Sequence, residues 1–509
     1  MGWRRILLSS LLLTGIIAAA PSRAAPPAPL VGRIAAADGA VALRPPGGTW
    51  QGAEVNEPVE GGAALHTTVP GRAGLHIGAD SVALAPDSEL ELGQLDAAKG
   101  LHLLLQRGRI GVVLSLADPA HTIEIDTLQG QVWLQTAGEY DIAAGDAKAP
   151  GRLAVFAGRA RVIGKGCDTT VAAGEASTLG QGCTAPTPLA DAAADGFVAW
   201  WRPAPGAAAA SAAPAHVSAD MTGHAALDGS GTWRTVGGDG AVWFPLTVPS
   251  GWTPYRFGHW RWMPPWGWTW IDDATWGFAP SHYGRWARFP APDGGERWGW
   301  VPGTYVADPA FAPAVVAFLG TAAVGISYAD ANGPAVGWFP LAPGEVYWPR
   351  YTKDLATIRR LNRGAVADVA AIVPAADGAP PTSVIDGTYR NRAFASVVPR
   401  AVFVSGKPVA PALVQLPKER LENAPLLAGS PDIKPSAPHA VAVASAAPPR
   451  RAAAKKTEAT RRLARILRQR HQAAAIAWRR RRHARLPITH ATYHGGERRH
   501  LRFATFRRR

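Results

Sequence analysis

Cysteine is scarce in this sequence, which has only two among 509 residues. Two cysteines cannot build a disulfide-rich scaffold or a zinc site closed by cysteines. After the first twenty residues no apolar run reaches the roughly 18 residues that a membrane helix needs, so a multi-span membrane protein is excluded. The 55 glycines and 45 prolines stay below the roughly 25–30% that marks wholesale disorder. A chain of this length and composition is therefore expected to form two or three folded units.

The signatures of common enzyme classes are also missing. The sequence has no Gly-x-Ser-x-Gly, Ser-x-x-Lys or His-Glu-x-x-His pattern and no phosphate-binding glycine loop. Glu124 and Asp126 alternate with isoleucines, which places both carboxylates on one face of a predicted strand, where we expect them to be solvated. His259 and His282 have no acidic neighbour at the spacing of a metal site. We therefore expect no enzymatic activity, catalytic residue, cofactor or bound metal.

The positive charge is concentrated at the C-terminus. The formal net charge is +15, yet the segment Arg450–Arg509 alone has 20 Lys and Arg residues against Glu458 and Glu497, a net of +18 that leaves −3 for the rest. This asymmetry indicates an appended basic arm that binds a polyanion, rather than a nucleic-acid-binding fold throughout.

The first residues have the pattern of a secretory signal peptide, over residues 1–24. Arg4 and Arg5 precede the apolar stretch Ile6–Ala20, and Ser22-Arg23-Ala24 supplies small residues at the positions before a cleavage site. The alternative is an uncleaved anchor, but this stretch is short for a ~30 Å hydrocarbon core. We expect a cleaved, periplasmic or secreted protein.

Cys167 and Cys183 are the only two thiols, and they lie sixteen positions apart. In an oxidising compartment the expected state is a disulfide, which contributes about 3 kcal/mol on the chain-entropy model. The alternative, a metal or redox pair, has no supporting histidine or Cys-x-x-Cys motif.

Short alternating apolar runs fill residues 30–186 and predict an all-β domain. This region resembles the FecR-like periplasmic domain. The resemblance rests on Gly39-x-Val41, Trp50, Asn56-Glu-Pro58, Gly71–Gly78, Leu105–Arg109, Glu124–Thr127, Gly138–Asp141, Gly158–Val162 and Ala173–Glu175. FecR-type regulators of sigma factors have a cytoplasmic segment before their membrane helix, whereas here four residues separate Met1 from the apolar stretch. A direct anti-sigma role is therefore not expected.

A second domain, residues 219–424, follows an Ala- and Pro-rich predicted linker at 203–218. Of the 20 tryptophans, 14 lie between Trp233 and Trp348. The segment Gly251–Trp260 aligns without a gap with Gly277–Trp286 at an offset of 26 residues, and each copy leads to a Trp-Gly-Trp strand. Two copies of one supersecondary unit are therefore expected.

Within a copy, the tryptophans lie two residues apart, which predicts a hairpin turned at Met263-Pro-Pro265. We expect a small antiparallel β meander or barrel whose interior is largely tryptophan, with a C-terminal extension. The fold class is therefore all-β for both domains.

This domain resembles a secreted Trp/Gly-repeat domain of unknown function that follows FecR-like domains in Gram-negative envelope proteins. The resemblance rests on the two repeats and on His216–Gly223, Gly231–Trp233, Pro313–Phe318, Gly337–Leu341, Glu345–Tyr347, Tyr389–Arg392 and Phe403–Val409. It implies an architecture and brings no established activity.

Each repeat presents one arginine and one histidine three residues apart, next to a tryptophan. The candidate ligand surface consists of Arg256, His259, Trp260, His282, Arg285 and Trp286. Such a cationic, aromatic surface suits anionic glycans through stacking and cation–π contacts. The alternative, which we favour, is that the tryptophans are core and the arginines stack on their rims, because a small β domain needs bulky residues to bury enough area.

The C-terminal region divides into a Pro/Ala/Ser-rich linker, 425–456, expected to be disordered, and a basic tail, 457–509. Residues 457–485 favour an amphipathic helix that binds an anionic surface such as lipopolysaccharide, anionic lipid or cell-wall glycan. The candidate anchor residues are Arg461, Arg462, Arg465, Arg468, Trp478, Arg479, Arg480, Arg481 and Arg482. An unbound solvated arm is the alternative, and nucleic acid is not expected as a partner after export.

The sequence thus predicts a non-catalytic envelope protein, a binding or scaffolding module tethered to an anionic surface by its tail. Two alternatives remain open. One is a FecR-like cell-surface signalling sensor that contacts an outer-membrane protein, and the other is a glycan-processing enzyme.

Overall fold

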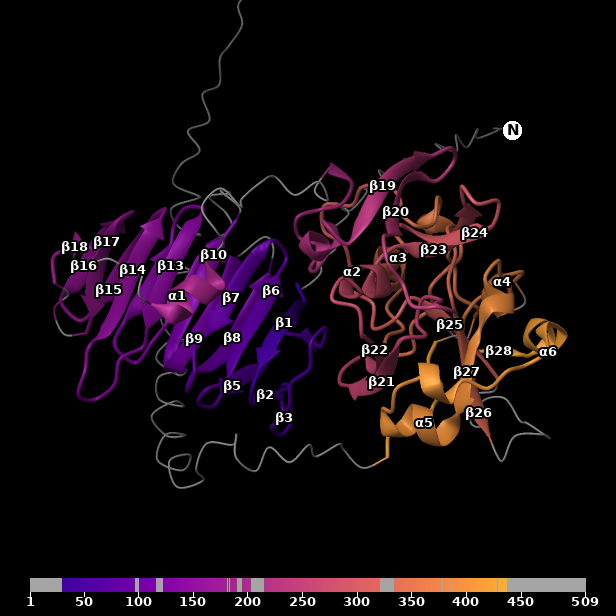
Figure 1. Ribbon diagram of the computed structural model, residues 1–509, viewed down its shortest axis with the longest axis horizontal. Helices are drawn as coiled ribbons and strands as arrows, with labels where there is room; N and C mark the ends of the chain where they lie inside the picture. The colour runs from indigo at the N-terminus through magenta and orange to yellow at the C-terminus, as the bar shows by residue number, and fades with distance from the viewer. Residues whose placement is uncertain are drawn as a thin grey trace, which may run out of the picture. The chain divides into compact units, whose positions relative to one another are not determined.

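A computed structural model describes residues 30–436, apart from 97–99, 116–121, 181, 183, 190–194, 203–214, 321–333, 377–378, 386 and 428. The chain divides into two units, residues 1–447 and 448–509, and all described residues belong to the first. The described part is mostly β-sheet with a few short helices, so the predicted all-β class is confirmed (Figure 1). None of the described helices is long and apolar enough to cross a membrane.

The first β domain consists of two nine-stranded sheets. In hydrogen-bonded order, one sheet contains β18 (Thr187–Pro188), β17 (Glu175–Leu179), β14 (Gly151–Ala157), β13 (Gly138–Ala143), β10 (Arg109–Leu114), β7 (Asp80–Leu84), β6 (Arg72–Ile77), β1 (Gly32–Asp38) and β4 (Pro58–Val59). The other contains β16 (Cys167–Ala172), β15 (Arg159–Gly164), β12 (Gln131–Leu134), β11 (Ile123–Asp126), β9 (Gly100–Arg107), β8 (Glu89–Asp96), β5 (Ala64–Thr67), β2 (Val41–Arg44) and β3 (Gln51–Gly52). Alternate apolar residues of both sheets form a single core, as a two-sheet packing requires.

A short helix, α1 (Gly196–Trp201), extends this domain beyond the predicted boundary at residue 186. The Trp201 ring lies so close to Gly111 that a side-chain carbon at position 111 would come within 2.3 Å of it, so the contact requires glycine. The Arg202 guanidinium pairs with Glu139 at 2.7 Å. Residues 196–202 are therefore part of the first domain.

The second β domain has three separate sheets, and none closes into a barrel, so the barrel alternative is wrong. The strands are β19 (Gly231–Val236), β20 (Gly240–Pro245), β24 (Glu296–Val301) and β23 (Arg285–Pro290) in one sheet, β21 (Gly258–Met263) and β22 (Gly267–Asp272) in the next, and β27 (Ser396–Pro399), β26 (Ala335–Pro340), β25 (Val316–Leu319) and β28 (Leu426–Leu427) in the last. The helices are α2 (Phe278–His282), α3 (Leu355–Leu361), α4 (Thr382–Ile385), α5 (Arg400–Ser405) and α6 (Lys418–Asn423), with 3-10 turns η2 (His224–Leu227), η3 (Val369–Ala371), η4 (Arg392–Phe394) and η5 (Ala410–Ala412).

The two sequence repeats form the hairpins β21–β22 and β23–β24, as predicted. Their tryptophans pack with rings from distant segments in one aromatic core. Side chains under 2% exposed in this domain include Trp243, Trp260, Trp268, Trp270, Trp300 and Trp338. The interpretation of the tryptophans as core is therefore confirmed for these positions.

Two predicted linkers are shorter than expected. At the first, Val217 and Ser218 are buried, and the Ser218 hydroxyl donates to the Ala307 carbonyl at 2.6 Å. At the second, β28 pairs with β25, and the carbonyl of the buried Ile433 accepts a hydrogen bond from Trp268 Nε1 at 2.8 Å. The prediction of disorder is wrong for the described residues 425–427 and 429–433, because Leu427 and Ile433 pack in the aromatic core.

The two β domains contact each other through Asn56, in the loop between β3 and β4. Asn56 has a left-handed backbone (φ 66°) and is 1% exposed. Its Nδ2 donates to the backbone oxygens of Asp272 and Ala274 at 2.9 and 2.7 Å, and its Oδ1 accepts from Arg33 at 2.7 Å. Backbone strain at this residue is therefore offset by three hydrogen bonds, of which the two donated by Nδ2 join the domains.

Candidate binding groove

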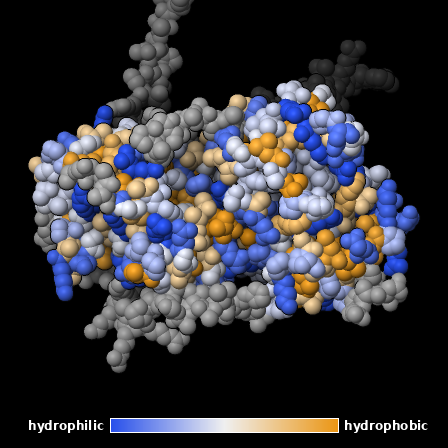
Figure 2. Space-filling model, viewed as in Figure 1, coloured by the Kyte–Doolittle hydropathy of each residue, from blue (hydrophilic) through white to orange (hydrophobic). Residues whose placement is uncertain are grey.

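Large hydrophobic side chains are rarely exposed in the described part of the chain. Those that are exposed lie in seven scattered positions, Val69, Leu128, Leu246, Val248, Trp262, Tyr305 and Val373. Figure 2 shows polar and apolar residues mixed over the visible face. Because this face has no broad apolar patch, a ligand site is better sought in the cavities.

Four of the six residues predicted to form a ligand surface are buried instead. Trp260, Trp286, His282 and Arg285 are each at most 2% exposed. Burial lowers the pKa of His282 to about 3, and its Nδ1 lies 2.7 Å from the Ala312 carbonyl oxygen. The predicted surface is wrong for these residues. Trp260 and Trp286 belong to the aromatic core, and His282 packs on the Phe311 ring. Arg285 points to the other side of its strand and is buried, with hydrogen bonds to the second domain's own oxygens.

The other two predicted residues have partners inside the protein. Arg256 donates to the Gly251 carbonyl at 2.8 Å, and burial lowers the pKa of its guanidinium. His259 Nε2 lies 3.0 Å from Glu54 Oε2, across the domain contact. The six residues therefore do not form one ligand surface, and this prediction is corrected.

A groove with a volume of about 630 Å³ is lined by both β domains. The first domain contributes Glu60 and the end of β8, including Gln94 and Asp96. The second contributes the turn of the β21–β22 hairpin at Trp266, together with Tyr351 before α3. This volume is in the range of sites that hold a ligand of two or three small rings.

The second-domain wall of the groove is aromatic. Trp266 and Tyr351 are partly exposed, whereas Phe311 is buried behind Trp266 with its ring centre 4.7 Å away. Phe311 is supported in turn by His282, at 4.6 Å between ring centres. This stack holds the Trp266 ring in place, which makes it a rigid platform for a flat apolar face.

The polar groups of the groove include hydroxyl, carboxyl, amide and guanidinium side chains. Thr352, Thr357 and Arg360 face the carboxylates and the amide of the first domain across the cavity. Burial raises the pKa of Glu60 to about 7, so this carboxyl group binds a proton near neutral pH. Burial also raises the pKa of the Tyr351 hydroxyl, which therefore stays protonated. The groove thus combines aromatic platforms with donors and acceptors.

No sequence pattern predicted this groove. Its residues extend from Leu30 to Leu361 and are of common types, so no motif or spacing links them. The repeat pattern identified only Trp266, as part of a strand.

A second polar cluster lies on the first domain, where β9, β11 and β12 adjoin. His102, Glu124 and Asp126 have donor atoms within 4.8 Å of one another, so these three residues could hold a metal ion. His102 Nε2 lies 2.8 Å from Asp126, and Gln131 donates to both carboxylates. Glu124 and Asp126 are 8% and 2% exposed, so the predicted solvated strand face is wrong. Their cross-strand hydrogen bonds give the cluster a structural role.

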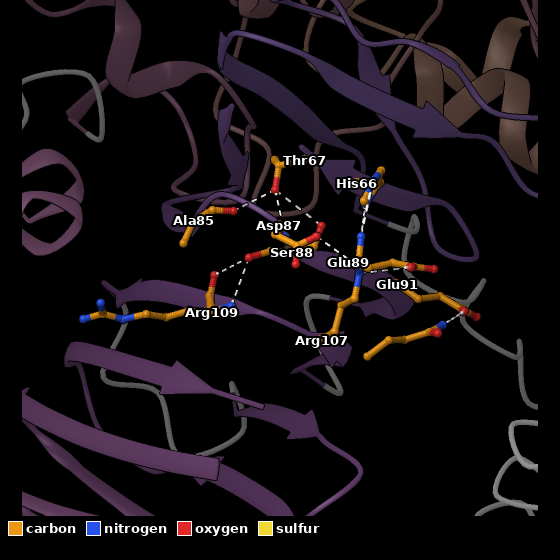
Figure 3. A network of polar contacts seen from close by, with 10 residues as sticks. His66, Thr67, Ala85, Asp87, Ser88, Glu89, Glu91, Arg107 and Arg109 are labelled. Carbon is orange, nitrogen blue, oxygen red and sulfur yellow. Dashed lines mark hydrogen bonds and ion pairs between the residues drawn. The ribbon is translucent and has the colours of Figure 1, made fainter. Parts of the chain in front are cut away.

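Figure 3 shows another network of this domain, around Arg107 on β9. The Arg107 guanidinium contacts Asp87 at 2.8 Å, Glu89 at 3.9 Å and His66 at 3.2 Å. Burial and the nearby Arg107 charge lower the pKa of His66. The network links β5, β8 and β9, and its charges are paired within the sheet.

The predicted disulfide and the tail anchor cannot be placed in the same way. Cys167 begins β16 and is buried, whereas Cys183 lies outside the described residues. The anchor residues between Arg461 and Arg482 and the signal peptide also lie outside them. These assignments remain predictions.

Comparison with known protein families gives a match for part of the second β domain. Residues 224–345, which include both Trp hairpins, match the model of DUF6600, a family of unknown function. Two solved structures of a candidate anti-sigma factor from Parabacteroides distasonis ATCC 8503 are similar to part of the chain, at 11% and 12% identity and a TM-score of 0.22. Each alignment covers 25% of this chain and 57% of that protein, so this chain spans little over half its length. The comparison with curated proteins gives no match.

Proposed function

We propose that this protein is an exported, non-catalytic envelope protein that binds a carbohydrate polymer in the groove between its β domains. The observation that carries the proposal is the groove itself, about 630 Å³ in volume, with partly exposed Trp266 and Tyr351 beside hydroxyl, amide and carboxyl groups. Sugar rings have an apolar face that packs on an aromatic ring and hydroxyls that need hydrogen-bond partners.

The export signal and the basic tail support the same role. Export to the envelope brings the groove to the compartment where cell-wall and surface polysaccharides occur. The tail, with its net charge of +18, would hold the module at an anionic surface. The groove then supplies selectivity, while the tail supplies proximity.

The proposal is tested by isothermal titration of the full chain with a neutral tetramer of N-acetylglucosamine. Trp266→Ala removes the platform and should weaken binding roughly tenfold, the equivalent of one lost aromatic contact with its buried area. Trp262→Ala is the matched control, since Trp262 is on the same hairpin, is 41% exposed and lies outside the groove. The proposal is refuted if both variants weaken binding equally, or if the unmodified chain does not bind the tetramer.

A further inference from the structure

A small pocket adjoins the groove in the second β domain. Its volume is about 40 Å³, roughly three times the ~10–15 Å³ that one water molecule needs. Ala310, Arg360 and Leu361 line both the groove and this pocket, so the two cavities are neighbours. Tyr305, which is 64% exposed, lies on the pocket lining and leaves it accessible from outside.

The lining of this pocket is cationic. It includes three arginines, Arg285, Arg360 and Arg363, and no aspartate or glutamate occurs among its lining residues. His282 also lines it but is neutral, because burial lowers its pKa to about 3. Arg363 is paired with Asp308 at 2.9 Å, outside that lining. The pocket therefore has the charge expected of an anion site.

Arg285 supplies the strongest reason to expect an anion. The side chain is buried, yet its guanidinium donates to neutral oxygens, the Glu345 and Gly284 carbonyls at 3.0 and 2.8 Å and Asn362 Oδ1 at 2.8 Å. Among the described residues, no carboxylate forms an ion pair with it. Burial lowers the pKa of Arg285 to about 10, which still leaves it charged at neutral pH.

Partial compensation comes from Glu345, whose charge acts on Arg285 through space. The carboxylate oxygens of Glu345 are occupied by the backbone N–H groups of Ala342 and Arg390, at 2.7 and 2.8 Å. A buried cation with only neutral hydrogen-bond partners is costly, and an anion in the adjoining pocket would lower that cost.

We infer that the pocket receives an oxyanion substituent, a carboxylate or a phosphate, of a sugar whose ring lies in the groove. This inference rests on the proposed function and deepens it, because it makes the ligand an acidic carbohydrate rather than a neutral one. The pocket volume fits one such group and is too small for a second sugar ring. Guanidinium groups bind planar and tetrahedral oxyanions with short, charge-assisted hydrogen bonds.

The test compares, by titration of the full chain, the neutral N-acetylglucosamine tetramer with a tetramer of alternating glucuronate and N-acetylglucosamine. The acidic tetramer should bind at least roughly tenfold more tightly, the effect of one charge-assisted hydrogen bond. N-acetylglucosamine 6-phosphate, compared with N-acetylglucosamine, forms the phosphate arm and shows which oxyanion is preferred. The inference is overturned if the neutral sugar and its acidic counterpart have nearly equal dissociation constants in both the glucuronate and the phosphate comparison.

Variants assign that preference to the pocket. Arg363→Gln and Arg360→Gln should each reduce the ratio several-fold, whereas Arg350→Gln should leave it unchanged. Arg350 is the matched control, since its side chain is 44% exposed like that of Arg363 and it pairs with Asp432 away from the pocket. An equal reduction in all three variants would show attraction by general positive charge and would contradict a built site.

The inference and the proposed function fail in different ways. Trp266→Ala should weaken the binding of both tetramers and leave the ratio of their dissociation constants unchanged, because it removes only the aromatic platform. If the neutral tetramer binds in a Trp266-dependent manner but the ratio is near one, the pocket inference alone fails. If no sugar binds, the remaining test is the thermal unfolding midpoint in inorganic phosphate. A rise in the midpoint that Arg360→Gln removes supports the pocket as an oxyanion site, and no rise refutes the pocket as such a site.

Discussion

Trp260→Ala tests the aromatic core most severely. The Trp260 side chain is 1% exposed, and its ring centre lies 5.2 to 5.5 Å from the rings of Phe318, Trp338, Phe403 and Trp270. Truncation of a buried tryptophan costs about 3–5 kcal/mol through lost burial and the remaining cavity. Because four aromatic contacts are lost at once and they come from three strands and a helix, we expect the upper part of this range.

Trp262→Ala is the comparison for this measurement. Trp262 is on the same strand but is 41% exposed, so its truncation should cost less than roughly 1 kcal/mol. Unfolding of the full chain in denaturant, followed by near-ultraviolet circular dichroism, gives the transition midpoint of the aromatic domain. Similar midpoints for the two variants would refute the assignment of Trp260 to the core. A loss for Trp286→Ala close to that for Trp260→Ala would extend the result to the second repeat.

The remaining predictions concern the domain contact, the thiols and the tail. Glu57 pairs with Arg261 of the second domain at 3.2 Å. Burial raises the pKa of Glu57 from 4.5 to about 7, so protonation of Glu57 stabilises the folded state at low pH, and this stabilisation is lost as pH rises from 4.5 through 7. The unmodified chain should therefore lose stability relative to Glu57→Gln as pH is raised from 5 to 7.5, measured as the difference between their free energies of unfolding. A difference that rises with pH would contradict the raised pKa of Glu57. Asn56→Ala should cost about 2–3 kcal/mol, since it leaves buried partners unsatisfied, and a midpoint shift close to zero in denaturant would show that the domain contact is weak. Mass spectrometry of envelope material should find an N-terminus near residue 25 and a Cys167–Cys183 disulfide, whereas retained Met1 with free thiols would contradict export. Removal of residues 450–509 should abolish salt-sensitive sedimentation with anionic vesicles, and equal sedimentation of both chains would show that the tail is not the anchor.

Local patterns in the sequence predicted the elements well. The alternating runs Ala73–Gly78 and Arg109–Leu114 correspond to β6 and β10. The turn predicted at Met263–Pro265 lies one residue later, at 264–266, because Met263 is the last residue of β21. The 26-residue offset relates two hairpins in the structure. These features depend on residues that are close in the sequence, so the spacing of residue types is sufficient to predict them.

Long-range features could not be predicted in the same way. The α2 helix occurs in the second repeat and has no counterpart in the first, so equivalent residues such as Arg256 and His282 have different environments. The groove and its pocket depend on how the two domains and α3 pack together. This packing produces no periodic pattern in the sequence. Burial of Arg285 is likewise decided by distant partners such as Asn362. Glu124 is buried beside Gln131 on the neighbouring strand, whereas its sequence pattern favours an exposed charge.

Oxidative footprinting of the full chain tests the central claim most directly. Hydroxyl radicals modify accessible aromatic side chains, and peptide mass spectrometry can distinguish Trp266 and Tyr351 in the groove from Trp262 outside it. With the acidic tetramer at saturating concentration, the modification rates of Trp266 and Tyr351 should fall several-fold while that of Trp262 stays constant. An unchanged rate at Trp266 under conditions where the sugar is bound would place the ligand elsewhere and contradict the assignment of the groove.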